Sequence, residues 1–263
     1  MPISLTEKIV LVTGASSGIG ASCAHFFADA GARLILSARR KEKLISLANE
    51  LKQKYQAETL LLPLDVQKAS EIAATIDGLP AEWQAIDILI NNAGLSRGLD
   101  KQYEAPLQDW EEMIDTNIKG LLYMTRAIAP GMVARNQGHV INIGSIAARY
   151  TYPGGSVYCA TKAAVKVLTE GLKIDLLGTP IRVTNIEPGL VETDFSNVRF
   201  RGDTDRAKGV YSGMTALTPD DIADSIFFAA TRPAHVNISE IYLIPTDQSS
   251  GTLINRTQPS QSQ

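Results

Sequence analysis

Short apolar runs alternate along the chain with longer stretches in which apolar residues recur at helical spacing. The runs are mostly continuous rather than broken by polar residues, which is typical of strands buried on both faces of a parallel sheet. These predicted strands cover residues 8–14, 32–39, 58–66, 86–94, 138–145, 181–189 and 240–247. Helices are predicted over residues 19–30, 43–55, 68–76 and 107–135 and around Tyr158. Right-handed crossovers between such strands produce a doubly wound, seven-stranded parallel α/β sheet with helices on both faces.

Length and composition fit one globular domain. The 263 residues are 44% hydrophobic and 20% charged, which is enough for a large core. No internal repeat or linker divides the chain. We therefore expect a single domain over residues 1–254 and a polar tail, residues 255–263, that is frayed.

Charge and cysteine content narrow the cellular setting. The formal net charge of −3 gives no reason to expect nucleic acid or an anionic membrane as a partner. No apolar run reaches the roughly 18 residues of a membrane span, and the first residues lack the pattern of a signal peptide. Two cysteines without a CxxC pattern predict a reducing, cytoplasmic setting. Three histidines that lie far apart in the sequence predict no metal site.

A glycine-rich turn follows the first predicted strand and precedes the first predicted helix. Gly14, Gly18 and Gly20 give the spacing G-x-x-x-G-x-G. Glycine lets the backbone approach a phosphate closely, and the start of a helix presents free N–H groups to it. Inside a strand–helix–strand unit this turn predicts a dinucleotide site; the alternative is a tight turn without a ligand.

The second predicted strand ends in Ser37, Ala38, Arg39 and Arg40. An NAD site usually has a carboxylate here, which bonds the ribose 2′-hydroxyl. Arginine suits a 2′-phosphate instead, and its plane can also stack on adenine. The alternative is a solvated basic helix start, which the helix dipole disfavours. We therefore predict NADP rather than NAD.

Further polar residues close the third and fourth predicted strands. Asp65 could reach the adenine amine, and Asn91 could hold either the centre of the sheet or the adenosine ribose. All these strand ends meet at the carboxyl edge of the sheet, where such folds bind ligands.

Tyr158 and Lys162 are four residues apart on a predicted helix, so they share one face. The pair is either an ordinary solvated contact or part of a catalytic site. With TGxxxGxG, NNAG at 91–94 and Ser145 at the end of the fifth strand, this YxxxK pattern resembles the classical branch of the short-chain dehydrogenase/reductase superfamily. The resemblance covers about residues 5–250 and implies a single-domain Rossmann fold.

The resemblance implies a role for each catalytic candidate. Tyr158 would be the acid/base, and Lys162 would lower the pKa of its phenol and bond the nicotinamide ribose. Ser145 would donate to the substrate oxygen, where negative charge grows during reduction. Asn117 would interrupt its helix locally and hold a water that relays protons to Lys162. Read from the sequence alone, Asn117 is only a helix-disturbing polar residue.

The implied cofactor site draws on the strand ends and on the resemblance together. Backbone near Val191 and the Thr193 hydroxyl would hold the nicotinamide amide. The full predicted cofactor set is Gly14, Ser16, Ser17, Gly18, Ile19, Gly20, Arg39, Arg40, Asp65, Val66, Asn91, Ala93, Gly94, Tyr158, Lys162, Pro188, Gly189, Val191 and Thr193.

The segment 193–211 is charged and loop-like, and it lies where members of this superfamily carry a substrate-covering loop. It contains Arg199, Arg201 and Arg206. An arginine fork there would clamp a carboxylate, whereas the alternative is a solvated loop face. We take Arg199 and Arg201, together with the two catalytic hydroxyls, as candidate substrate ligands.

A narrower resemblance rests on FSNVRFRGD, MIDTNIKGLLYMTRAIAPGMV, PAHVNI and PTDQS. These stretches are similar to the NADP-dependent 3-hydroxy acid dehydrogenases. That group oxidises serine, allo-threonine, 3-hydroxyisobutyrate and 3-hydroxypropionate, and it reduces malonic semialdehyde. Arg149 departs from the pattern of that group and predicts a larger or differently charged substrate.

Two other functions stay open at this point. One is another reductase of the superfamily, acting on a 3-oxoacyl thioester or a small ketone. The other is a non-catalytic NADP-binding regulator on the same fold. An intact set of Asn117, Ser145, Tyr158 and Lys162 argues against the regulator, which would need none of them.

The two longest predicted helices are apolar on more than one face. Residues 107–135 carry Leu121, Leu122 and Met124, and residues 155–176 carry Val157, Ala164, Val165 and Leu168. A surface helix needs only one apolar stripe, so the extra face predicts a partner helix. The resemblance implies a homotetramer built through these elements.

Overall fold

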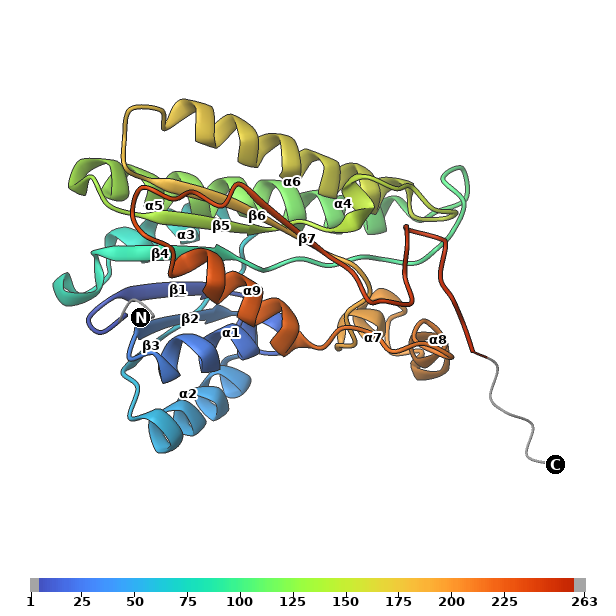
Figure 1. Cartoon of the computed structure of the whole chain (residues 1–263), viewed down its shortest axis with the longest axis horizontal. Coiled ribbons are helices and arrows are strands. Elements are labelled where there is room, and N and C mark those ends of the chain that lie inside the picture. Colours follow the sequence, from blue (N-terminus) through green and yellow to red (C-terminus); the bar gives the residue numbers. More distant parts are fainter. Residues whose placement is uncertain (1–4, 258–263) are drawn as a thin grey trace.

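Seven parallel strands form one sheet in the order β3-β2-β1-β4-β5-β6-β7 (Figure 1). The computed structural model describes residues 5–257. The strands are β1 (Ile9–Thr13), β2 (Arg33–Ala38), β3 (Thr59–Pro63), β4 (Ile86–Asn91), β5 (His139–Ile143), β6 (Arg182–Pro188) and β7 (Glu240–Leu243). All six neighbouring pairs are parallel. The predicted sheet is therefore confirmed, and the order reverses between β1 and β4.

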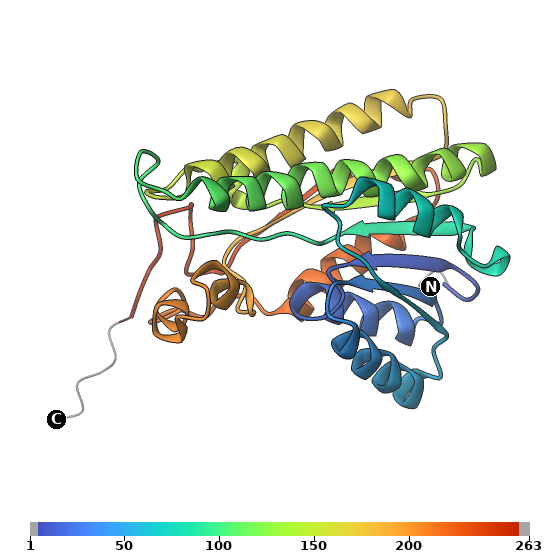
Figure 2. The same ribbon diagram turned by 180° about the vertical axis from the view of Figure 1, so that it is seen from behind.

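Helices cover both faces of the sheet (Figures 1 and 2). One face carries α1 (Gly18–Asp29), α2 (Lys41–Tyr55) and α9 (Pro219–Ala230). The other carries α3 (Ala69–Asp77), α4 (Leu107–Ile114), α5 (Leu121–Arg135) and α6 (Ser156–Asp175). Each layer encloses its own core, because successive strand residues point to opposite faces. In β1, Val10 and Val12 belong to the first core, and Ile9 and Leu11 belong to the second.

The stretch predicted as one helix over 107–135 is continuous but not uniform. Between α4 and α5 lies a π-helical segment, η2 (Asp115–Gly120), which contains Asn117. The local interruption expected around Asn117 is therefore present. Such π-helical turns widen the helix and often occur at functional sites.

Helix α9 was not predicted, although its start carries a clear signal. Pro219 occupies the first turn, and Thr218 and Asp221 form a reciprocal capping box. The helix packs against α1 and closes the first core.

The segment 193–211 is not only a loop. It contains two short helices, α7 (Phe195–Arg199) and α8 (Thr204–Gly209), which project beyond the carboxyl edge of the sheet (Figure 1). Both helices are too short to be stable in isolation, so their positions depend on contacts with other elements.

The described part of the predicted tail returns to this segment. Thr257 N donates to Gly213 O over 2.8 Å, and Arg256 donates to Val210 O over 2.9 Å. Residues 255–257 are therefore bonded rather than frayed, and residues 258–263 lie outside the described range.

Candidate active site

A cavity of about 700 Å³ opens at the carboxyl edge of the sheet. Its walls include residues that directly follow β1, β2, β3, β4, β5 and β6, together with the segment around α7. Of the site residues predicted from sequence, all line this cavity except Gly20, Asn91, Asn117 and Arg201. The predictions from separate motifs thus converge on one place.

The glycine turn between β1 and α1 forms one wall. Gly14 and Gly18 have φ of +65° and +55°, in the left-handed region that favours glycine. Gly20 does not reach the cavity, but a Cβ there would lie 2.5 Å from Gly14 O. The third glycine therefore packs the start of the helix against the turn, so that the N–H groups of α1 face the cavity.

The residue after β4 anchors this turn, and it is Asn92 rather than Asn91. Asn92 Nδ2 donates to Thr13 O over 2.9 Å and lines the cavity. Asn91 points into the sheet, where its Nδ2 donates to Asn142 Oδ1 over 2.9 Å and to Thr125 Oγ1 over 3.0 Å. Of the two roles open to Asn91, the structure supports the one at the centre of the sheet.

Basic and hydroxyl side chains gather beside the end of β2. Arg40 donates to Ser16 Oγ and Ser17 Oγ, each over 3.0 Å, and Arg39 also lines the cavity. Asp65 and other residues after β3 form the adjoining wall. Two guanidinium groups, two hydroxyls and the start of α1 make a donor set that fits a nucleotide with a 2′-phosphate.

Tyr158 and Lys162 lie on α6, and both are buried in the inner part of the cavity. Lys162 Nζ donates to Ile143 O over 2.8 Å and lies 5.9 Å from the centroid of the Tyr158 ring. Ser145 begins the 3-10 helix η3 (Ile146–Ala148) after β5 and is within hydrogen-bonding reach of the Tyr158 hydroxyl. The sheet and α6 thus bring the three candidates together, as the sequence predicts.

Asn117 lies behind these residues rather than in the cavity. Its Oδ1 accepts from Leu95 N over 2.9 Å, and its Nδ2 donates to Leu95 O over 2.8 Å and to Thr161 Oγ1 over 3.0 Å. These bonds join η2 to the chain after β4 and to the helix turn that carries Lys162. The structure gives Asn117 a bracing role, and its proton-relay role stays a prediction.

Burial changes the protonation of both α6 residues. Burial, and then the nearby Tyr152 phenol, raise the pKa of Tyr158, while Arg199 and hydrogen bonding with Ser145 act to lower it. Burial also lowers the pKa of Lys162 to about 8. The net direction for Tyr158 is opposite to the lowering expected from Lys162, because loss of water around the phenolate outweighs the nearby positive charge.

Arg199 at the end of α7 lines the cavity close to Tyr158. Its guanidinium lies 5.7 Å from the centroid of the Tyr158 ring and 5.3 Å from that of Tyr152. It also donates to the Tyr152 hydroxyl. A planar cation at this position can hold an anionic group beside the Tyr158 hydroxyl.

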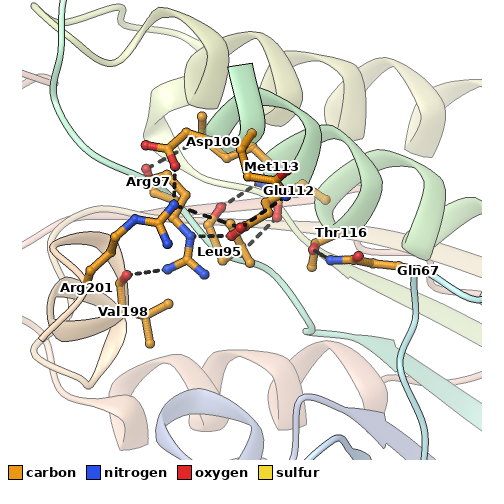
Figure 3. Close-up of polar contacts among 12 residues, drawn as sticks. Gln67, Leu95, Arg97, Asp109, Glu112, Met113, Thr116, Val198 and Arg201 are labelled. Atoms are coloured by element: carbon orange, nitrogen blue, oxygen red, sulfur yellow. Dashed lines mark hydrogen bonds and ion pairs between the residues drawn. The ribbon is translucent and has the colours of Figure 1, made fainter. Parts of the chain in front are cut away.

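Arg201 does not reach the cavity. It forms an ion pair with Asp109 of α4 and lies 3.9 Å from Glu112, and its side chain is 56% exposed (Figure 3). The structure therefore does not place Arg201 in the cavity, and its role as a substrate ligand stays a prediction. Arg206 stacks on Phe200 at 4.5 Å from the ring centroid and also lies outside the cavity.

Several cavity residues were missed from the sequence. Tyr152, Phe195 and Tyr211 line the cavity; Tyr152 and Phe195 pack near Tyr158, and the Phe195 ring lies 5.8 Å from the Tyr158 ring. Tyr211 is fixed by its hydrogen bond to Val191 O, 2.9 Å long. Phe195 and Tyr211 lie in the predicted substrate-covering segment, but none of the three directly follows a strand, so no local pattern marked them as cavity residues.

Arg149 forms ion pairs outside the cavity. It pairs with Glu187 of β6, whose side chain is fully buried, and with Glu240 of β7. Lys166 completes the cluster, 2.9 Å from Glu240. Because this charge is neutralised by carboxylates of the sheet, Arg149 gives no support to a larger or differently charged substrate.

We expect Arg149→Ala to lower the free energy of unfolding by about 3 kcal/mol, since it strands the buried Glu187 carboxylate with only Asn185 and, at 3.9 Å, Lys166 beside it. Adding Glu187→Gln to this variant should recover part of the loss, because the stranded group is then neutral. Urea unfolding followed by circular dichroism measures both. A change within about 0.5 kcal/mol for Arg149→Ala, the usual range at the surface, would contradict this account.

Known proteins similar to this chain share its fold and much of its sequence. The sequence model of the family described as short chain dehydrogenase matches residues 8–203. An NADP-dependent 3-hydroxy acid dehydrogenase of Salmonella typhi is 49% identical over 251 residues, which cover 95% of this chain and 100% of that protein. An NADP-dependent 3-hydroxy acid dehydrogenase of Schizosaccharomyces pombe is 45% identical, with 97% and 98% covered.

Solved structures agree with these sequence relatives. The closed form of serine dehydrogenase complexed with NADP+ superposes with a TM-score of 0.88 at 48% identity, covering 95% of this chain and 100% of that one. Serine dehydrogenase from Escherichia coli superposes with a TM-score of 0.79 at 46% identity, covering 92% and 99%.

Proposed function

The chain belongs to the short-chain dehydrogenase family, and from that premise we propose that it transfers a hydride between NADP(H) and a short 3-hydroxy acid. The observation that carries the substrate class is the position of Arg199, whose guanidinium lies 5.7 Å from the Tyr158 ring inside the cavity. A carboxylate bound there leaves a hydroxyl two carbons away within reach of Tyr158. The proposed substrates are serine, allo-threonine, 3-hydroxyisobutyrate and 3-hydroxypropionate, as in the relatives that the sequence resembles.

Each side chain has one task in the proposed reaction. Bound NADP+ supplies the acceptor for the hydride that leaves the hydroxyl-bearing carbon. Tyr158 takes the proton of the substrate hydroxyl, and Ser145 donates a hydrogen bond to the same oxygen. Arg199 binds the substrate carboxylate and thereby orients the substrate. The positive charge of Lys162 stabilises the Tyr158 phenolate. In the direction of reduction Tyr158 returns the proton to the oxygen.

The protein should produce NADPH from 3-hydroxy acids and much more slowly from matched compounds that lack the carboxylate, such as methyl 3-hydroxypropionate. Charge-assisted hydrogen bonds contribute about 1.5–3 kcal/mol each, which corresponds to about ten- to hundredfold in kcat/KM. Arg199→Met should remove this preference and leave the ester rate nearly unchanged.

Other outcomes of the same assay separate the remaining functions. Equal rates with acid and ester, or a preference for 3-oxoacyl thioesters or simple ketones, would show a different reductase of the family. No turnover of any compound, with NADP still bound, would show a regulator.

NADP should be preferred to NAD by about tenfold or more, because Arg39 and Arg40 line the cavity next to the end of β2. Arg39→Ala should raise the KM for NADP and leave that for NAD almost unchanged. Initial rates with each cofactor measure this. Equal losses with both cofactors would show that Arg39 only packs.

We expect a homotetramer that acts in the cytoplasm. On α6, Val167 and Ile174 are 65% and 72% exposed, and Leu177, just beyond the end of this helix, is 82% exposed. Leu122 of α5 is also exposed. Of the residues named from sequence, Leu121, Met124 and Val165 instead pack inside the protein. Among residues 5–257, no helix is long and apolar enough to cross a bilayer. A monomer mass in light scattering at micromolar concentration would contradict the oligomer.

A further inference from the structure

Arg199 is held at both its backbone and its side chain by the chain that follows β4. Gly98 N donates to Arg199 O over 3.0 Å, and Arg199 Nε donates to Gly98 O over 3.2 Å. These two bonds connect α7 to a loop about a hundred residues earlier in the sequence. The direction in which Arg199 enters the cavity therefore depends on this loop.

Four charged side chains lie close to this connection in sequence or in contacts, and none of them lines the cavity. Figure 3 shows how these four side chains meet. Arg97 donates to Val198 O, next to Arg199, and its Nε lies 2.6 Å from Glu112 Oε2. Arg201, two residues beyond Arg199, pairs with Asp109 and approaches Glu112. We call Arg97, Asp109, Glu112 and Arg201 the clasp.

Helix α4 contributes the two carboxylates of the clasp. Asp109 and Glu112 are three residues apart, so they lie on one face of the helix. Partial burial acts to raise the pKa of Glu112, but hydrogen bonding to Arg97 holds it below its usual value, so the carboxylate is charged at neutral pH. Asp109 is only 5% exposed, so its charge needs a partner.

Arg201 carries a backbone conformation that needs support. Its φ is +51°, in the left-handed region that side chains other than glycine rarely adopt. A conformation of this kind persists where surrounding contacts impose it. The ion pair with Asp109 supplies one such contact, two residues beyond the end of α7.

We propose that the clasp positions Arg199 over Tyr158, so that the substrate carboxylate and hydroxyl engage both residues at once; this inference rests on the proposed function. The four residues lie outside the cavity, so they act through Arg199 as positioning residues. Small displacements of an orienting group cost much of its contribution to rate. The clasp thereby sets specificity for acids.

The test uses Arg201→Gln and Asp109→Asn, alone and combined, in the full chain. Each single variant should raise the KM for 3-hydroxypropionate about tenfold and change kcat less, because orientation of the carboxylate is lost rather than the chemistry. Rates with the methyl ester and the KM for NADP should stay unchanged. The double variant should be no worse than either single variant, because both remove the same contact.

Two further variants separate the clasp from general effects of charge. Arg201→Lys keeps the cation and should restore part of the affinity for the acid. Lys208→Gln removes an exposed cation of α8 for which residues 5–257 provide no ion pair, and it should behave as the wild type.

Hydrogen exchange gives a readout that needs no substrate. The backbone amides of residues 195–203 should exchange about tenfold faster in Arg201→Gln than in the wild type if the clasp holds α7 in place. Unchanged exchange, additive effects in the double variant, or equal losses with acid and ester would each overturn the clasp. Faster exchange together with a wild type that turns over no 3-hydroxy acid would instead refute the proposed function.

Discussion

Tyr158→Phe is expected to lower kcat by about 10²–10⁴-fold, the usual contribution of a general acid/base group. The substitution keeps the ring, so its packing against Phe195, 5.8 Å away between centroids, is retained. Only the hydroxyl that exchanges a proton with the substrate oxygen is lost. Initial rates of NADPH formation measure the loss, and fluorescence titration with NADP shows whether the cofactor still binds.

A neighbouring phenol provides the matched control. Tyr152 lines the same cavity and accepts a hydrogen bond from Arg199, but the Tyr158 hydroxyl is the one beside Ser145. Tyr152→Phe removes a hydrogen bond from the charged Arg199 group, so it should raise the KM for the acid by about ten- to hundredfold. It should change kcat much less, because the Tyr158 hydroxyl is retained. A Tyr158→Phe protein that folds correctly and still turns over would refute the mechanism.

The strands were predictable because burial on both faces leaves a simple signature. Continuous apolar runs such as residues 9–12 divide between the two cores, and no polar position breaks them. Each motif lies next to a strand end, and parallel strands bring their ends to one edge. The sequence therefore predicted where the cavity is and which turns line it.

The sequence could not predict which of two adjacent polar residues faces the cavity. Asn91 and Asn92 are both amides at the end of β4, but consecutive strand residues point to opposite sides. Which of them turns toward the glycine loop depends on how β4 is registered against β1.

The same limit applies to the arginines near α7. Arg199 and Arg201 are two residues apart, and both could bind a carboxylate. The structure separates them because α4 offers Asp109 to one, while the cavity receives the other. This contact joins residues far apart in sequence, and no local pattern indicates it.

Protonation was the least predictable property. Spacing on α6 shows that Tyr158 and Lys162 are neighbours, but the direction of their pKa shifts follows from burial. Burial favours the neutral form of both groups, which raises the pKa of the phenol and lowers that of the ammonium. The depth of a side chain is a property of the whole fold.

These opposite shifts give a pH dependence that Lys162→Met should change. Because Lys162 Nζ lies 5.9 Å from the centroid of the Tyr158 ring, we expect the two groups to titrate as a coupled pair, whose first proton leaves near the pKa of Lys162, about 8. Oxidation needs the pair to accept a proton, so its rate should rise with pH through about 8. Reduction needs the pair to give a proton, so its rate should fall through the same range.

Lys162→Met leaves Tyr158 as the only group of the pair, with a pKa that burial raises above its ordinary value of about 10. The rise in oxidation rate should therefore move up by at least about two pH units, and at pH 7 the fraction of the protein that can accept the substrate proton falls about a hundredfold. The KM for NADP should also rise, because the Lys162 ammonium lines the cavity. Lys162→Arg keeps a charge but is longer and planar, so it should not restore full activity. Lys173→Met, on the same helix but outside the cavity, should keep the wild-type profile. If the profile of Lys162→Met stays where it is and only the KM for NADP rises, Lys162 binds the cofactor without tuning Tyr158.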